Sequence, residues 1–185
     1  MNDRVRKLTF SALYLAIALV LPFVTGQIPE IGAMLSPMHI PVLLCGFVCG
    51  WPWGLAVGLI APCLRSVLFG MPALYPTAIA MTVELGVYGL LSGLLYRALP
   101  RRTRSVYAAL LPAMIGGRLA WGGARYVLAG LSGSEFPLSA FLAGAVLNAI
   151  PGIILQIVLI PLLVMILEKA KLTMNGKRTS AADPR

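Results

Sequence analysis

The chain has 185 residues, of which 59% are hydrophobic and only 11% are charged, and its formal net charge is +9. A soluble domain normally carries about 25% charged residues, so this composition excludes a soluble protein and indicates an integral membrane protein in a lipid bilayer. The basic residues flank apolar segments instead of forming a stripe with interleaved aromatics, which excludes nucleic acid as the partner that explains the net charge.

The apolar residues form six segments, and spans of about 20 residues each would use most of the chain. We predict membrane-spanning helices over residues 8–24, 38–50, 54–69, 76–96, 106–128 and 138–167. A tight Trp-Pro-Trp turn at 51–53 separates the second span from the third, and its Trp rings suit the membrane interface. Residues 1–171 are therefore predicted to form one all-α bundle of six transmembrane helices. A disordered cytoplasmic tail is predicted over 172–185.

The basic residues predict the orientation of this bundle. All but three of the 15 Lys and Arg lie in the N-terminal tail, in one mid-chain loop or in the C-terminal tail: Arg4, Arg6, Lys7, Arg97, Arg101, Arg102, Arg104, Lys169, Lys171, Lys177, Arg178 and Arg185. Cytoplasmic flanks of spanning helices carry an excess of Lys and Arg, so these regions are predicted to be cytoplasmic. Six spans place both termini on that side, whereas five would separate the two basic tails.

Six polar side chains inside the apolar segments are candidate site residues. At a rise of about 1.5 Å per residue, all of them lie at or above the predicted bilayer midplane, in its external half. They are His39, Arg65, Glu84, Arg118, Arg125 and Asn148. An ionisable residue in a membrane interior is costly, and by default it marks a functional site or a pair. The convergence of several such residues predicts a polar substrate-binding cavity that opens to the outside.

The predicted cavity holds three arginines and one glutamate, which leaves it with a net positive charge. The planar fork of arginine donors suits a carboxylate or a phosphate, and Glu84 would accept hydrogen bonds from hydroxyl or NH groups. Aromatic side chains, with Tyr88 and Trp121 among them, could stack on a planar ligand. These features favour a small anionic or zwitterionic solute.

Structural roles stay open for the same residues. Glu84 could pair with one arginine simply to hold two helices together. Arg65 could extend to the external headgroups, and Asn148 could form a hydrogen bond between helices. His39 could be an interface residue with no ligand.

Sequence motifs for catalysis or ATP hydrolysis are missing. There is no GxxxxGK[ST] phosphate loop, no HExxH and no GxSxG. Cys45, Cys49 and Cys63 form no CxxC pair and are interpreted as small packing residues. The chain is therefore predicted to be a binding cup that is not an enzyme, holds no metal or cofactor, and has no driving machinery of its own.

Small residues recur at four-residue spacing, which lets helix backbones approach closely in lipid. Most of these pairs are predicted to pack inside the bundle, as for Gly46 and Gly50, Gly54 and Gly58, and Gly89 and Gly93. The pair Ala12 and Ala16 differs because it lies just past the basic N-terminal tail. A partner helix could dock there from the cytoplasmic side.

Four features together carry a family resemblance: a small six-span chain, a long first external connection at 25–37, an Ala-x-x-x-Ala motif at Ala12–Ala16, and Gly-spaced helices at 41–50 and 54–58. This profile resembles the substrate-binding S components of energy-coupling factor (ECF) vitamin transporters. The resemblance implies a bacterial plasma-membrane protein that captures a water-soluble vitamin or precursor from outside. It also implies docking onto a transmembrane coupling subunit with two ATPase subunits, which use the ATP. The positive cavity favours an anionic substrate such as pantothenate.

Three other functions stay open. A self-sufficient small-solute channel or facilitator would need a polar path through both halves of the bundle. A membrane enzyme could use His39 or Glu84 as a base, but it would need a second catalytic group at the same depth. In a structural subunit of a larger complex, the interior arginines would pair with acidic residues of a partner.

Overall fold

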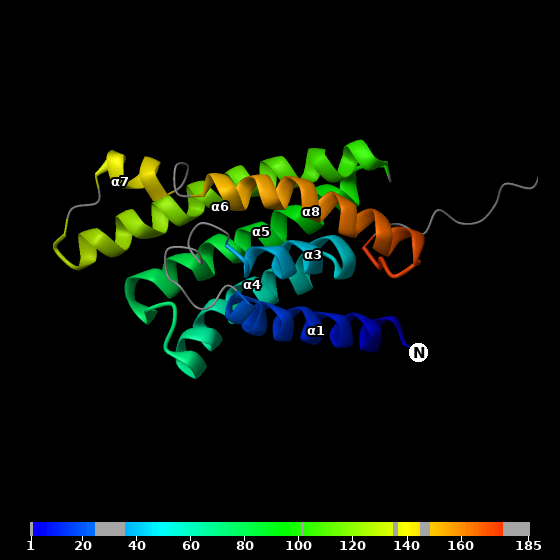
Figure 1. Cartoon of the computed structure of the whole chain (residues 1–185), viewed down its shortest axis with the longest axis horizontal. Coiled ribbons are helices and arrows are strands. Elements are labelled where there is room, and N and C mark those ends of the chain that lie inside the picture. Colours follow the sequence, from blue (N-terminus) through cyan, green and yellow to red (C-terminus); the bar gives the residue numbers. More distant parts are fainter. Residues whose placement is uncertain (1, 25–35, 101, 135–136, 145–148, 176–185) are drawn as a thin grey trace, which may run out of the picture.

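The computed structural model describes residues 2–24, 36–100, 102–134, 137–144 and 149–175, and these residues form an all-helical structure. The elements in chain order are α1 (Asp3–Val24), α3 (His39–Cys49), α4 (Trp51–Phe69), the π-helical turn η1 (Leu74–Ala78), α5 (Ile79–Ala98), α6 (Thr103–Leu131), α7 (Leu138–Leu142) and α8 (Ile150–Lys169). The longer helices run roughly along the long axis of the molecule (Figure 1). The predicted all-α class is confirmed.

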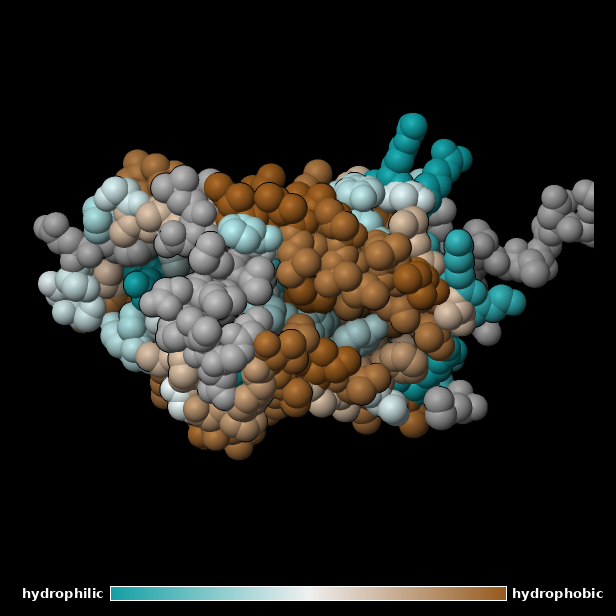
Figure 2. Space-filling view, viewed as in Figure 1, coloured by the Kyte–Doolittle hydropathy of each residue, from teal (hydrophilic) through white to brown (hydrophobic). Residues whose placement is uncertain are grey.

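Four stretches are long and apolar enough to cross a membrane: Asp3–Val24, Trp51–Phe69, Leu74–Ala98 and Ile150–Lys169. They match the predicted first, third, fourth and sixth spans, and the chain is a multi-pass membrane protein. Hydrophobic residues cover the middle of the face shown in Figure 2. α3 is an apolar helix of only 11 residues, and α6 carries Arg118 and Arg125 within its apolar sequence. The second and fifth spans therefore stay predictions.

One local prediction is wrong. The Trp-Pro-Trp sequence is not a turn but the start of α4, where a proline fits because the first helical N–H groups have no intrahelical partner. The chain changes direction at Gly50, whose φ of 100° suits a residue without a Cβ. Of the predicted sixth span over 138–167, the structure describes α7 and α8, and residues 145–148 between them lie outside the described residues. Pro151 lies in the first turn of α8, where proline favours a helix start.

Both ends of the described chain lie at one end of the bundle (Figure 1). The Arg6 guanidinium donates a hydrogen bond to the backbone carbonyl of Lys171, with an Nη2···O distance of 3.2 Å. At the same end, the Tyr96 hydroxyl of α5 donates to the Glu168 carboxylate of α8. The basic N-terminal tail, the loop between α5 and α6 and the end of α8 therefore share one end, which we call the basic end.

The segment after α8 packs against the basic end as far as the structure describes it. The backbone N–H of Met174 donates to the carbonyl of Val48 over 2.7 Å. The buried Asn175 amide donates to the carbonyls of Gly46 (3.0 Å) and Gly93 (2.9 Å), which joins α3 to α5. The packed bundle thus continues to Asn175, beyond the predicted boundary at 171, while 176–185 lie outside the described residues.

Glycines set the spacing of α3, α4 and α5. A Cβ added to Gly54 would lie 2.6 Å from the Gly89 carbonyl oxygen, and one added to Gly46 would lie 2.7 Å from the same atom. Such contacts are too short for any side chain, so the backbones approach as closely as small residues in membrane helices allow. The predicted internal role of these glycine pairs is confirmed. This packing holds α5, the central helix, in fixed register against α3 and α4.

We expect Gly89→Ala to lower the free energy of unfolding by about 1 to 3 kcal/mol, because the new methyl group would overlap the Gly54 backbone. Thermal and denaturant unfolding followed by circular dichroism in detergent would measure the change. Gly123→Ala is the matched control, since no atom lies within 4 Å of its added Cβ. Equal stabilities of the two variants would contradict this account of the packing.

Candidate functional site

A charged cluster lies in the core, at the contact of α3, α5 and α6. Glu84 of α5 is only 1% exposed. Its Oε1 lies 3.0 Å from Nη1 of Arg118 on α6 and 3.2 Å from Nε2 of His39 on α3. The three side chains come from segments far apart in the sequence. They meet because α5 packs against both α3 and α6.

Tyr88 extends this cluster by one helical turn of α5, because residues four apart share a helix face. Its ring is fully buried and makes an edge-to-face contact with the His39 ring, with centroids 5.1 Å apart. Gly117 lies directly against the Tyr88 ring, and a Cβ there would be 2.8 Å from two ring carbons. A glycine next to Arg118 thus lets α6 approach α5 closely enough for Arg118 to reach Glu84. We call His39, Glu84, Tyr88 and Arg118 the core cluster.

Several buried atoms of the core cluster have no hydrogen-bond partner among the described residues. They are Nδ1 of His39, the hydroxyl of Tyr88, and Nε and Nη2 of Arg118. Buried polar groups are nearly always paired, because an unpaired one loses its hydration without compensation. A set of such groups around one ion pair is the arrangement expected where a polar ligand binds.

Gln156 of α8 belongs to the same class of groups, although the sequence analysis did not single it out. It is 0% exposed, and neither its amide nitrogen nor its amide oxygen has a hydrogen-bond partner among the described residues. The signal in the sequence was a single amide within an apolar run of α8, Ile-Ile-Leu-Gln-Ile-Val-Leu-Ile. Asn148, an amide in the same predicted span, gave a sequence signal of the same kind.

Arg65 lies at a different place from the core cluster. Its guanidinium donates to the backbone carbonyl of Leu19 in α1 and lies over the rings of Phe23 (4.8 Å) and Phe69 (5.4 Å). The two rings also contact each other edge to face at 5.0 Å. Arg65 is 3% exposed. These contacts join the ends of α1 and α4, so we expect Arg65 to support the fold and not to contact the substrate.

The remaining predicted site residues form a second group or lie outside the described residues. Arg125 lies over the ring of Trp121, 5.9 Å from its centroid, and Trp121 stacks on Phe141 of α7 at 6.3 Å. This group is one to two helical turns along α6 from Arg118. Asn148 lies outside the described residues. The structure thus brings together four of the predicted residues, and their roles in substrate binding stay predictions.

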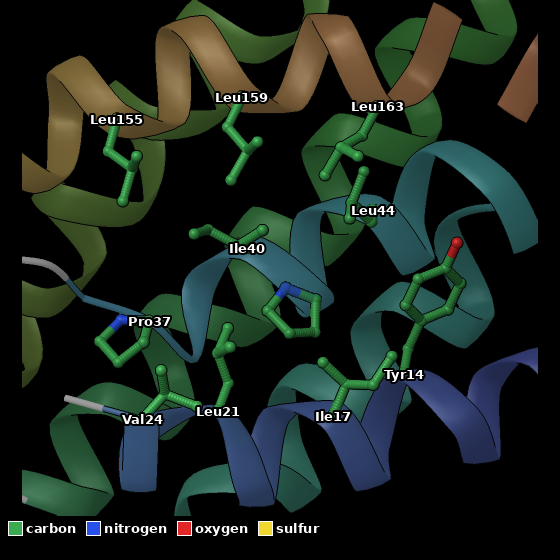
Figure 3. A pocket seen from close by; sticks show the side chains of 11 residues that line it. Tyr14, Ile17, Leu21, Val24, Pro37, Ile40, Leu44, Leu155, Leu159 and Leu163 are labelled. Atoms are coloured by element: carbon green, nitrogen blue, oxygen red, sulfur yellow. The ribbon is translucent and has the colours of Figure 1, made fainter. Parts of the chain in front are cut away.

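A groove of about 400 Å³ lies elsewhere, between α1, α3 and α8 (Figure 3). Its lining is apolar, with Ile17 and Leu21 of α1 on one side, Leu155 and Leu159 of α8 on the other, and Ile40 of α3 between them. A polar solute would lose its hydrogen bonds to water there and gain none. The groove is therefore unsuited to a polar solute, whereas the core cluster offers polar groups.

The described residues contain no group of three or more His, Cys, Asp or Glu that could hold a metal ion. The core cluster offers only His39 and Glu84 as ligand types, beside a permanently charged arginine. Such a pair next to a cation suits hydrogen bonding of an organic solute better than metal binding.

The described residues thus form a multi-pass helical bundle with a polar cluster in its core. The sequence model of the family "ECF transporter, substrate-specific component" matches residues 6–164, which is most of the chain. The chain therefore belongs to this family, whose members are transporter subunits and not enzymes. They bind a small-molecule substrate and associate with the transmembrane and ATPase subunits of the transporter. Comparisons with curated proteins and with solved structures find no match to the chain.

We expect Arg65→Ala to lower the free energy of unfolding by about 2 to 4 kcal/mol, since it removes a charged hydrogen bond and two contacts with aromatic rings. Denaturant unfolding in detergent would measure the effect. Arg104→Ala at the exposed start of α6 is the control, with an expected change within about 0.5 kcal/mol. The structural assignment of Arg65 would be refuted by a variant as stable as this control.

Proposed function

We propose that this chain captures a small water-soluble vitamin or vitamin precursor and that the core cluster is its binding site. The observation that carries the proposal is the pair of the buried Glu84 with the half-buried Arg118, surrounded by donors and acceptors that have no partner among the described residues, in a chain of the ECF substrate-specific family. A buried pair that served only to join helices would be expected to have its remaining hydrogen-bonding groups satisfied.

The proposed orientation has six spans with both termini in the cytoplasm of a bacterium. The gathering of the basic segments at one end of the bundle supports it, because cytoplasmic flanks are rich in Lys and Arg. His39, at the start of α3, and the second turn of α5 with Glu84 then face the external half. A substrate would reach the core cluster from outside.

The proposed docking surface for the coupling subunit is the Ala12–Ala16 face of α1. α1 buries Ser11, Tyr14 and Ala18 against the bundle, whereas both alanines are exposed. Exposed small residues let a partner helix approach the backbone closely. The partner complex would supply two ATPase subunits, and this chain would bind no cofactor of its own.

An anionic substrate, with pantothenate as the example, stays a prediction. It was based on an excess of arginines in the cavity. Within the described residues, only Arg118 contacts Glu84, while Arg65 and Arg125 contact aromatic rings instead. The net charge of the substrate is therefore a separate question from the transport function.

Replacing Ala12 and Ala16 with Trp is expected to reduce transport at least about tenfold in vesicles containing the whole transporter, because a bulky face prevents close helix contact. Substrate binding to the isolated chain should not change. Ala108→Trp, an exposed alanine on α6, is the matched control and should keep full transport. Normal transport by the double variant would refute this docking surface.

Native mass spectrometry of the gently purified chain is expected to detect a retained molecule of vitamin size. Arg118→Ala should lose it, because the variant removes the guanidinium donors of the core cluster and leaves His39 as the one remaining ion-pair partner of Glu84 among the described residues. Arg104→Ala should retain it. A chain that carries only lipid, and that no vitamin stabilises, would favour a channel or a structural subunit instead.

A further inference from the structure

Glu84 and Arg118 form one ion pair within the core cluster, and Nε2 of His39 lies 3.2 Å from the same carboxylate oxygen. Arginine stays protonated in proteins, and Glu84, at 3.0 Å, supplies the opposite charge within the core. The other two interior arginines have different surroundings, with Arg65 between Phe23 and Phe69 and Arg125 over Trp121. A cavity with three cations and one anion, as the sequence suggested, is therefore replaced by one ion pair.

The polar groups of the core cluster that have no partner among the described residues include both hydrogen-bond donors and acceptors. Arg118 offers donors at Nε and Nη2, while the Tyr88 hydroxyl and the His39 ring can each donate or accept. A second anion placed against Arg118 would also lie close to the Glu84 carboxylate, where a low dielectric makes repulsion strong. A solute with no net charge avoids this repulsion and can still satisfy the donors and acceptors.

Gln156 lies at the depth of the core cluster. At about 1.5 Å per residue, Glu84, Arg118 and Gln156 are each about 20 to 22 Å from the basic end of their helices. Gln156 is on the buried stripe of α8, with Gly152, Ile160 and Val164, and α8 packs against both α3 and α6. Those two helices carry His39 and Arg118. The amide therefore lies on the side of α8 that faces these helices.

We propose that the substrate of this site carries no net charge, being neutral or zwitterionic, and that Gln156 is a residue that determines its recognition. This inference rests on the proposed function. The ion pair orients the polar atoms, and specificity comes from a pattern of donors and acceptors to which Gln156 contributes one of each. Glu84 would repel an anionic solute. A solute without matching polar groups would leave the buried Gln156 amide unpaired, which would weaken its binding.

The first test is the sign of the effect of Gln156→Leu. If Gln156 serves the ligand, the ligand-free variant should unfold at the same or a higher temperature, because an unpaired amide is replaced by an apolar group of similar size. Its affinity for the retained ligand should fall about 10- to 100-fold. Ile160→Leu, one turn further on the same stripe, should change neither quantity much. A loss of stability with unchanged affinity would overturn the role of Gln156.

The second test is the charge of the bound solute. Thermal unfolding of the wild-type chain would be measured with riboflavin and pyridoxine as uncharged probes and with pantothenate and biotin as anions, and native mass spectrometry would identify the retained molecule. An uncharged or zwitterionic ligand supports the inference. An anion bound by the wild type overturns it but leaves the proposed function intact, whereas no vitamin-sized ligand at all overturns both.

A third test is the variant Glu84→Gln, which removes the negative charge of the core cluster. It leaves Arg118 as an unpaired cation in the core, so the site should lose its uncharged ligand and gain affinity for pantothenate or biotin. Equal anion binding before and after the substitution would contradict the role of Glu84. Should this variant not fold, the Gln156→Leu comparison and the identity of the retained ligand still decide the inference.

Discussion

The ion pair between Glu84 and Arg118 is the constraint on which the arrangement of the core depends. Removing two charges from water costs several kcal/mol for each ion, and the interior of a membrane protein offers no water to repay it. The cost is tolerable only where the two side chains meet at short distance. α5 and α6 must therefore pack in one register, and Gly117 beside the Tyr88 ring permits the close approach that this register needs.

Two kinds of contact hold the other helices around that pair. On one side of α5, glycines allow the backbones of α3 and α4 to approach α5 closely. This packing places Nε2 of His39 3.2 Å from the Glu84 carboxylate. Near the C-terminal end of α4, Arg65 contacts a carbonyl of α1 and two aromatic rings, which attaches the first helix to the bundle. Arginine thus forms an ion pair at position 118 and joins two helices at position 65, according to the partners within its reach.

The bundle is also divided along its length. At the basic end, hydrogen bonds from Asn175 and Tyr96 and from Arg6 close the contacts among α3, α5 and α8 and between the two termini. The unpaired polar groups lie further along the helices, at the level of the core cluster. Hydrogen bonds thus close one end of the bundle, and the polar interior lies further along its length.

The sequence by itself determined the class of protein. Its composition and the positions of its basic residues were enough for a multi-pass helical membrane protein with its basic segments at one end, because lipid tolerates only apolar, internally hydrogen-bonded spans. It also identified the interior charges, and the family resemblance drawn from its motifs is confirmed.

The sequence did not show which of the interior side chains contact one another. The rotation and shift of each helix against its neighbours decide that Arg65 lies apart from Glu84, that His39 contacts Glu84 and that Gln156 is buried. Only the tertiary structure decided these, because rotation and shift result from contacts among residues far apart in the chain, which no local pattern records.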